Sequence, residues 1–158
     1  MKKFFKNKRG FTLLEVLVAV SVLVIGSVAA FSTISATIRS VTFAKDKLIA
    51  SFLAQEGIEI VKNIRNTNWI RGNPWNQGLS SGSWQVDYND TSLSNYTGAF
   101  LNLGANGYYS YDPGGTPTKF QRRITIQQVS PDELRVRVEV FWEGRRFEVT
   151  SIITNWWQ

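Results

Sequence analysis

The feature that most constrains this chain is an uncharged, apolar segment near its N-terminus. Residues 16–38 form 23 consecutive positions without a formal charge and without proline. A helix of that length spans about 34 Å, which exceeds the ~30 Å hydrocarbon core of a bilayer. Small residues alternate with Val, Leu, Ile and Phe, a mixture that favours close packing of neighbouring helices in lipid. The segment therefore predicts one transmembrane helix.

Positive charge is concentrated ahead of this segment. Beyond the first ten residues, 13 basic and 12 acidic residues remain, so the formal net charge of +6 comes almost entirely from the N-terminal tip. Cations at one end of an apolar helix orient that end toward the cytoplasm. We read the charge as a membrane-orientation signal and expect no nucleic-acid partner. The five cations are Lys2, Lys3, Lys6, Lys8 and Arg9.

The residue types that are missing limit the chemistry. The chain has no Cys and no His, which excludes disulfides, Ser-His-Asp and Cys-His nucleophiles and the usual zinc sites. Asn102, Asn106 and Asp112 offer oxygen ligands for calcium, but they include only one carboxylate and match no known calcium loop. We expect no enzyme activity, no metal site and no cofactor.

Glu15 is a carboxylate just inside the apolar segment, where an ionised group costs ~3 kcal/mol or more. A secretory signal peptide would be shorter and would carry its cleavage site after the apolar core. A plain single-span anchor fits the length but leaves Glu15 unexplained. A third interpretation is cleavage between Gly10 and Phe11, which would free an α-amine that Glu15 of a neighbouring subunit could pair with. At 4 Å and an effective dielectric of 20, such charges attract by about 4 kcal/mol before desolvation is subtracted.

Residues 8–17, Lys-Arg-Gly-Phe-Thr-Leu-Leu-Glu-Val-Leu, resemble the N-terminal processing motif of type IV prepilins and type II secretion pseudopilins. The resemblance implies that prepilin peptidase cleaves after Gly10 and methylates the new N-terminus at Phe11, and that Glu15 is the assembly carboxylate. It also implies three further partners: other pilin or pseudopilin subunits, an inner-membrane assembly platform and the lipid of the cytoplasmic membrane. Pili, secretion pseudopili and DNA-uptake filaments share this motif, so it does not separate them.

Helical periodicity continues beyond the membrane segment. Apolar residues recur at spacings of three and four, which predicts one helix from Phe11 to about Asn66 with an amphipathic second half. The stripe over residues 41–64 should cover a soluble domain. Residues 52–59 also resemble the minor-pilin or minor-pseudopilin branch. The stripe comprises Ile34, Ile38, Val41, Leu48, Ile49, Phe52, Leu53, Ile60, Val61 and Ile64.

Residues 68–118 are rich in Asn, Gly, Ser, Trp and Tyr, which indicates turns and loops. We expect a short strand at residues 83–88 and a hairpin that joins residues 99–103 to 107–111. In pilin-like folds the corresponding region is the most variable. Its aromatic residues are expected mainly in the core and in contacts between subunits.

Residues 119–155 carry the clearest strand alternation, with three strands that each have one apolar face. Glu143 and Gly144 form a two-residue hairpin loop, and a five-residue loop surrounds Pro131. On the opposite face, the row of Arg123, Glu139 and Glu148 is expected to be solvated. The expected pairs are Val140 with Phe147, Val138 with Val149, Leu134 with Ile153, Ile126 with Val136, and Ile124 with Val138.

We therefore expect an α+β, pilin-like fold in which a long N-terminal helix packs on a C-terminal antiparallel β-sheet. The expected organisation is a basic leader (1–10), a transmembrane or filament-core helix (11–38) and a soluble domain (39–158). That domain would comprise a helix continuation (39–67), a variable region (68–118) and the sheet (119–155).

The expected function is a non-catalytic structural subunit of a type IV pilus or type II secretion pseudopilus. It would cross the cytoplasmic (inner) membrane once and then enter a cell-surface or periplasmic filament. The alternative is a tip or surface subunit on the same architecture that binds DNA, a glycan or a secreted substrate through tryptophans such as Trp75, Trp84 or Trp157.

Overall fold

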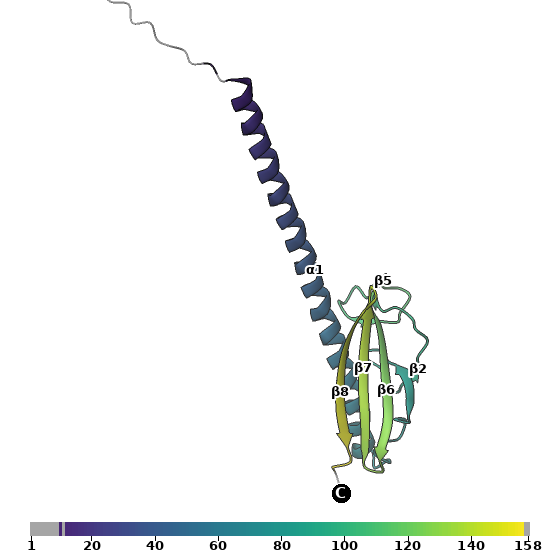
Figure 1. Ribbon diagram of the computed structural model, residues 1–158. Coiled ribbons are helices and arrows are strands. Elements are labelled where there is room, and N and C mark those ends of the chain that lie inside the picture. The colour runs from purple at the N-terminus through teal and green to yellow at the C-terminus, as the bar shows by residue number, and fades with distance from the viewer. Residues whose placement is uncertain (1–9, 11, 157–158) are drawn as a thin grey trace, which may run out of the picture. The chain divides into compact units, whose positions relative to one another are not determined.

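The computed structural model describes residue 10 and residues 12–156 (Figure 1). The chain divides into two compact units, Met1–Ala44 and Lys45–Gln158. One helix, α1 (Leu13–Ile70), runs through both. Its first part has no buried residue, and its second part lies on a β-sheet, so the expected α+β pilin-like layout is confirmed.

Helix α1 ends four residues later than expected, at Ile70. Gly72 adopts a φ of +69°, and its N–H donates to the carbonyl of Trp69 at 3.0 Å. The N–H of Asn73 donates to the carbonyl of Asn68 at 2.9 Å. These two bonds form a Schellman motif with glycine in the left-handed position that follows the helix. Gly72, which is present in the sequence, is the stop signal.

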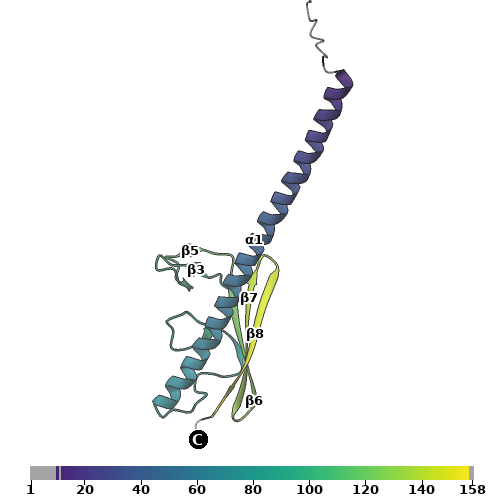
Figure 2. The same cartoon turned by 90° about the vertical axis from the view of Figure 1, so that its left-hand side faces the viewer.

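The second unit contains two antiparallel sheets. The five-stranded sheet has the order β2-β1-β6-β7-β8, and the small sheet has the order β4-β3-β5. In both views β6, β7 and β8 run side by side along the second part of α1 (Figures 1 and 2). The strands are β1 (Gly82–Gln85), β2 (Ser94–Asn95), β3 (Asn102–Leu103), β4 (Tyr109–Ser110), β5 (Thr116–Pro117), β6 (Gln121–Ser130), β7 (Glu133–Trp142) and β8 (Arg145–Thr154).

The predicted register of the long strands is confirmed at all five expected pairs. Glu143 and Gly144 both have positive φ, as a tight hairpin turn between right-twisted strands requires. The loop between β6 and β7 is shorter than expected, because Ser130 still pairs with Glu133 across a bulge. Val129 is an extra residue in β6 at this bulge. The pairs that precede it therefore keep the register that a five-residue loop would set.

The connecting region differs more from the expectation. The hairpin of β3 and β4 is present, but β1 begins one residue before the predicted strand (83–88) and ends three residues before its end, at Gln85. The two-residue strands β2 and β5 were not predicted. Asn68 holds the start of this region, because its buried amide donates to the carbonyls of Trp75 and Gln77 at 3.1 and 2.9 Å.

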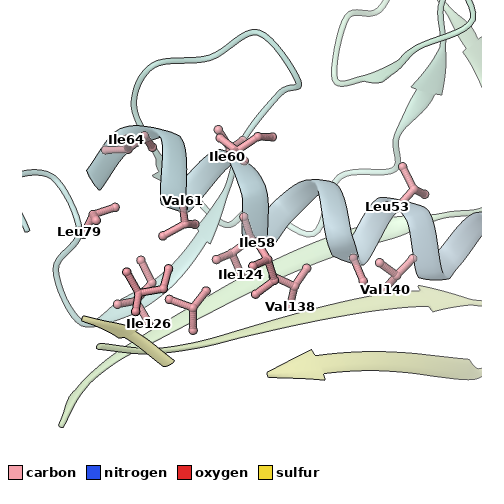
Figure 3. Packing of buried hydrophobic residues seen from close by; sticks show 14 of the residues in the cluster. Leu53, Ile58, Ile60, Val61, Ile64, Leu79, Ile124, Ile126, Val138 and Val140 are labelled. Carbon is pink, nitrogen blue, oxygen red and sulfur yellow. The ribbon is translucent and has the colours of Figure 1, made fainter. Parts of the chain in front are cut away.

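The core lies between α1 and the inner face of the large sheet (Figure 3). Ile58 and Val61 face Ile124, Ile126 and Val138 across this interface. Part of the expected stripe is wrong, since Leu48 and Phe52 are 55% and 60% exposed. A flat sheet covers less than half of the circumference of a helix. The spacing of the apolar residues alone does not show which side of the helix is covered.

Gly57 marks the closest approach of helix and sheet. A Cβ built at Gly57 would lie 2.9 Å from Cγ1 and 3.3 Å from Cγ2 of Val138. Alanine at this position gains about 1 kcal/mol of helix propensity but overpacks a buried contact at a cost of about 1–3 kcal/mol.

We expect Gly57→Ala to lower the free energy of unfolding by about 1 kcal/mol. The double variant Gly57→Ala/Val138→Ala should lose less than the sum of the two single losses, because truncating Val138 makes room for the new methyl group. Urea unfolding followed by tryptophan fluorescence measures the cycle. Additive losses would contradict the contact.

Tyr111 links the connecting region to the large sheet. Its hydroxyl donates to the carbonyl of Arg122 at 3.2 Å, and its N–H donates to Asp87 Oδ1 at 2.8 Å. Burial raises the pKa of Tyr111 to about 12.

Because the folded-state pKa of Tyr111 is raised, its contribution to stability is complete below pH 10 and is lost as the pH rises from 10 through about 12. We expect Tyr111→Phe to flatten the fall in unfolding free energy over that interval. Urea unfolding at pH 9, 10, 11 and 12 measures both proteins. Parallel curves would show that Tyr111 does not contribute to alkaline destabilisation.

Candidate assembly site at the start of the helix

The first turn of α1 is closed by Thr12 and Glu15. The hydroxyl Oγ1 of Thr12 accepts the N–H of Glu15 at 3.3 Å. In return, Glu15 Oε2 accepts the N–H of Thr12 at 3.2 Å and its hydroxyl at 3.3 Å. This reciprocal pattern is a capping box, which satisfies two of the backbone donors that a helix N-terminus leaves open.

Sequence reasoning missed this role of Thr12. A Thr followed three residues later by Glu, ahead of an apolar run, is the sequence signature of a capping box. The premise that a plain anchor leaves Glu15 unexplained is therefore wrong, because Glu15 already has a partner within its own chain. The carboxylate also lies at the positive end of the helix dipole, where a negative charge is favoured.

Gly10 lies two residues before Thr12 in the sequence and is exposed. A Cβ built at Gly10 meets no atom within 4 Å. A larger side chain at this position therefore disturbs no packing among the described residues. Phe11, the predicted first residue after cleavage, lies outside the described residues.

The helix surface that follows is apolar and uncovered. Every residue from Leu13 to Lys45 is exposed, and the helix is long and apolar enough to cross a membrane. Four of its hydroxyl groups donate to the carbonyl four residues earlier, which leaves these donors satisfied without water. The four bonds are Ser21 to Leu17, Ser27 to Leu23, Thr33 to Ala29 and Thr37 to Thr33, at 2.8–3.0 Å.

Comparison with known proteins bears on this end of the chain. The family model described as the prokaryotic N-terminal methylation motif matches residues 5–31. This match supports a type IV pilin-like protein. The matched residues include Gly10, the capping box and residues 16–31 of the membrane-length segment. No curated protein and no solved structure matches the chain.

The motif implies processing by prepilin peptidase and assembly with other pilins. Proteins of this family are typically structural and non-catalytic. Among the described residues one helix is apolar and long enough to cross a membrane, which together with the motif is consistent with membrane anchoring. The match ends at residue 31, ahead of the second unit, and the minor pseudopilin branch is not confirmed.

The tryptophans proposed for a binding surface differ in burial. Trp75 is 8% exposed and belongs to the core. Trp84 is half-buried, and its indole Nε1 donates to the carbonyl of Ser80 at 3.0 Å. Trp157 lies outside the described residues. Trp75 is therefore unsuitable as a probe of surface binding.

Two of the oxygens considered for calcium accept other hydrogen bonds, since Asn106 Oδ1 accepts the N–H of Tyr108 at 3.1 Å and Asp112 Oδ1 accepts the N–H of Gly114 at 2.9 Å. The amide of Asn102 donates to the carbonyl of Asp112 at 2.8 Å, and that of Asn106 donates to the Tyr88 hydroxyl at 3.2 Å. Among the described residues, no group of three or more His, Cys, Asp or Glu residues could hold a metal ion. These contacts order the loop around the small sheet.

Proposed function

We propose that this protein is a non-catalytic structural subunit of a type IV pilus or type II secretion pseudopilus. Prepilin peptidase cleaves it after Gly10 and methylates the amine of Phe11, and the N-terminal helix then carries it from the cytoplasmic membrane into the filament. The observation that carries the proposal is the methylation motif at residues 5–31, which coincides with a capped, membrane-length apolar helix.

Glu15 has two successive partners in this proposal. In the precursor its carboxylate closes the capping box with Thr12. After cleavage the α-amine of Phe11 is a full positive charge four residues from Glu15. The carboxylate of an incoming subunit then pairs with the amine of a subunit already in the filament, and this attraction favours assembly over residence in lipid.

Replacement of Gly10 tests the cleavage. Gly10→Val should abolish processing, because the branched side chain occupies the position next to the bond that is cut. The measurement is intact-mass spectrometry of the protein from cells that contain prepilin peptidase. The native chain should lack residues 1–10 and carry one added methyl group, and the variant should keep its full length.

Gly26→Val is the matched control, since a Cβ at Gly26 also meets no atom within 4 Å and the residue lies inside the helix. It should be processed like the native chain. An intact leader on the native protein in the presence of the peptidase would refute the proposed function.

A further inference from the structure

The outer face of the large sheet, which points away from α1, contains a buried carboxylate. Glu139 on β7 pairs with Arg123 on β6 and with Glu148 on β8, in the row expected to be solvated. Glu139 is nevertheless only 2% exposed. The expectation of a solvated row is wrong at Glu139, because the long side chains of Arg123 and Arg146 fold over its carboxylate.

Two arginines hold this carboxylate from opposite sides. Nε and Nη2 of Arg123 donate to Glu139 Oε2 at 2.9 and 2.6 Å, and Nη1 of Arg146 donates to Oε1 at 3.0 Å. Each guanidinium has five N–H groups in a rigid plane, so these bonds fix the arginines without using all their donors. Glu139 thus holds the two guanidinium groups in a defined orientation.

Both arginines line a cavity of about 560 Å³ beside the turn between β7 and β8. Aromatic rings form part of its wall, including Phe100, which is 54% exposed, and Phe141, whose ring centroid lies 5.2 Å from the Arg123 guanidinium. Gln121 and Arg145 also line it. Aromatic walls with a few oriented polar groups are typical of ligand sites of this volume.

The charge around the cavity favours an anion of low charge. Four cations line it (Lys119, Arg123, Arg145 and Arg146), against Glu143 at the rim and the buried Glu139, which leaves a net charge of +2. Lys119 already contacts Asp46 and Glu143 at 2.7 and 3.2 Å. Glu148 lies on the same face next to Arg146, and a longer polyanion that extended beyond the cavity would meet it. One carboxylate therefore suits the site better than a run of phosphates.

We propose that this cavity binds a carboxylate-bearing sugar unit of an acidic polysaccharide. The two oxygens of a carboxylate can accept two parallel N–H bonds from one arginine, because their spacing matches the planar guanidinium group. The apolar face of the sugar ring packs on Phe100. The amide nitrogen of Gln121 donates to the carbonyl of Gly98 at 2.6 Å, and its oxygen accepts a sugar hydroxyl. The proposal goes beyond assembly, because it gives the soluble unit a ligand that the filament function does not require.

The test uses the full-length protein in detergent micelles, with trigalacturonate and its methyl ester as probes in isothermal titration calorimetry. Trigalacturonate should bind, and its neutral ester should bind at least about tenfold more weakly, since it lacks the charge that the arginines recognise. Raising the salt concentration should weaken binding of the acid, because the cavity is open to solvent.

Arg145→Gln and Phe100→Ala should each weaken trigalacturonate binding about tenfold or more without a change in the unfolding midpoint. Arg135→Gln is the matched control. Arg135 lies on the same sheet face at the other end of β7 and does not line the cavity, so its replacement should leave affinity within twofold.

Equal binding of acid and ester, no binding of the acid, or retained affinity in both cavity variants would overturn the proposal. Tighter binding of an oligothymidylate than of trigalacturonate would also overturn it, in favour of single-stranded nucleic acid. Each of these results leaves cleavage after Gly10 unaffected, so the proposed function and the cavity are tested separately.

Discussion

Replacing Arg122 with alanine is expected to lower the free energy of unfolding by about 3 kcal/mol. Arg122 lies on the apolar face of β6 and is 0% exposed. Its Nη1 donates to Glu56 Oε1 at 2.7 Å and to the carbonyl of Leu53 at 3.2 Å, and its Nη2 donates to the carbonyl of Val86 at 2.6 Å. One side chain thus joins helix, sheet and connecting region.

The expected cost comes mainly from the acceptors left behind. Alanine would leave the carbonyl of Val86 without its arginine donor in the core, remove the second bond to the carbonyl of Leu53 and leave a cavity. The lost bond to Glu56 would cost less, because about one third of the Glu56 side chain is exposed and water can hydrate its carboxylate. For this reason we place the cost at the lower end of the range for a broken buried pair.

Two further variants separate packing from polarity. Arg122→Met should be less damaging than Arg122→Ala, because it fills the cavity and removes the buried Nε, which has no hydrogen-bond partner among the described residues. Arg135→Ala, on the outer face, should change stability by no more than about 0.5 kcal/mol. Urea unfolding followed by tryptophan fluorescence measures all three. A loss below 1 kcal/mol for Arg122→Ala would mean that the guanidinium does not anchor the helix.

Removing the charge of Glu15 is expected to reduce incorporation into filaments at least about tenfold, while membrane insertion stays normal. The structure allows the two roles of Glu15 to be separated. Glu15→Gln keeps the acceptor that the capping box needs and removes only the charge. Thr12→Ala keeps the charge and removes the cap, at a cost of about 1 kcal/mol to the helix start.

If pairing with the Phe11 amine drives assembly, Glu15→Gln should fail as completely as Glu15→Ala, and Thr12→Ala should assemble nearly normally. The measurement is the fraction of each protein in sheared filaments, at matched membrane levels. Normal incorporation of Glu15→Gln would show that the cap alone accounts for Glu15. A severe defect in Thr12→Ala with normal Glu15→Gln would lead to the same conclusion.

The sequence predicted the three long strands and their pairing, because period-two alternation and a two-residue turn at Glu143 leave one register that keeps every apolar side chain on one face. It did not predict β2 and β5, since a strand of two residues has no alternation to detect and, unlike β3 and β4, these two are not joined to each other by a hairpin turn. Helix α1 was recognised from its composition, whereas its end required the chemistry of Gly72.

Two charged residues show what periodicity cannot provide. Arg122 lies on the apolar face of its strand, but its helix partner Glu56 is 66 residues away, and no local pattern connects them. Glu139 was placed in a polar row, and its burial depends on how the side chains of Arg123 and Arg146 fold over it. The capping contact at the helix start differs from these two, because the local Thr-x-x-Glu pattern of Thr12 and Glu15 is enough to predict it.

The position of β8 in the sheet has a consequence for the state of the protein outside a filament. β8 is ten residues long and, within the described part of the chain, pairs only with β7. An open strand edge of this length is a template for pairing with another chain. Arg145 and Arg146 place charge at one end of the edge, whereas Ile152 is 49% exposed near the other. Uncontrolled self-association of excess protein is therefore expected to begin at the Ile152 end.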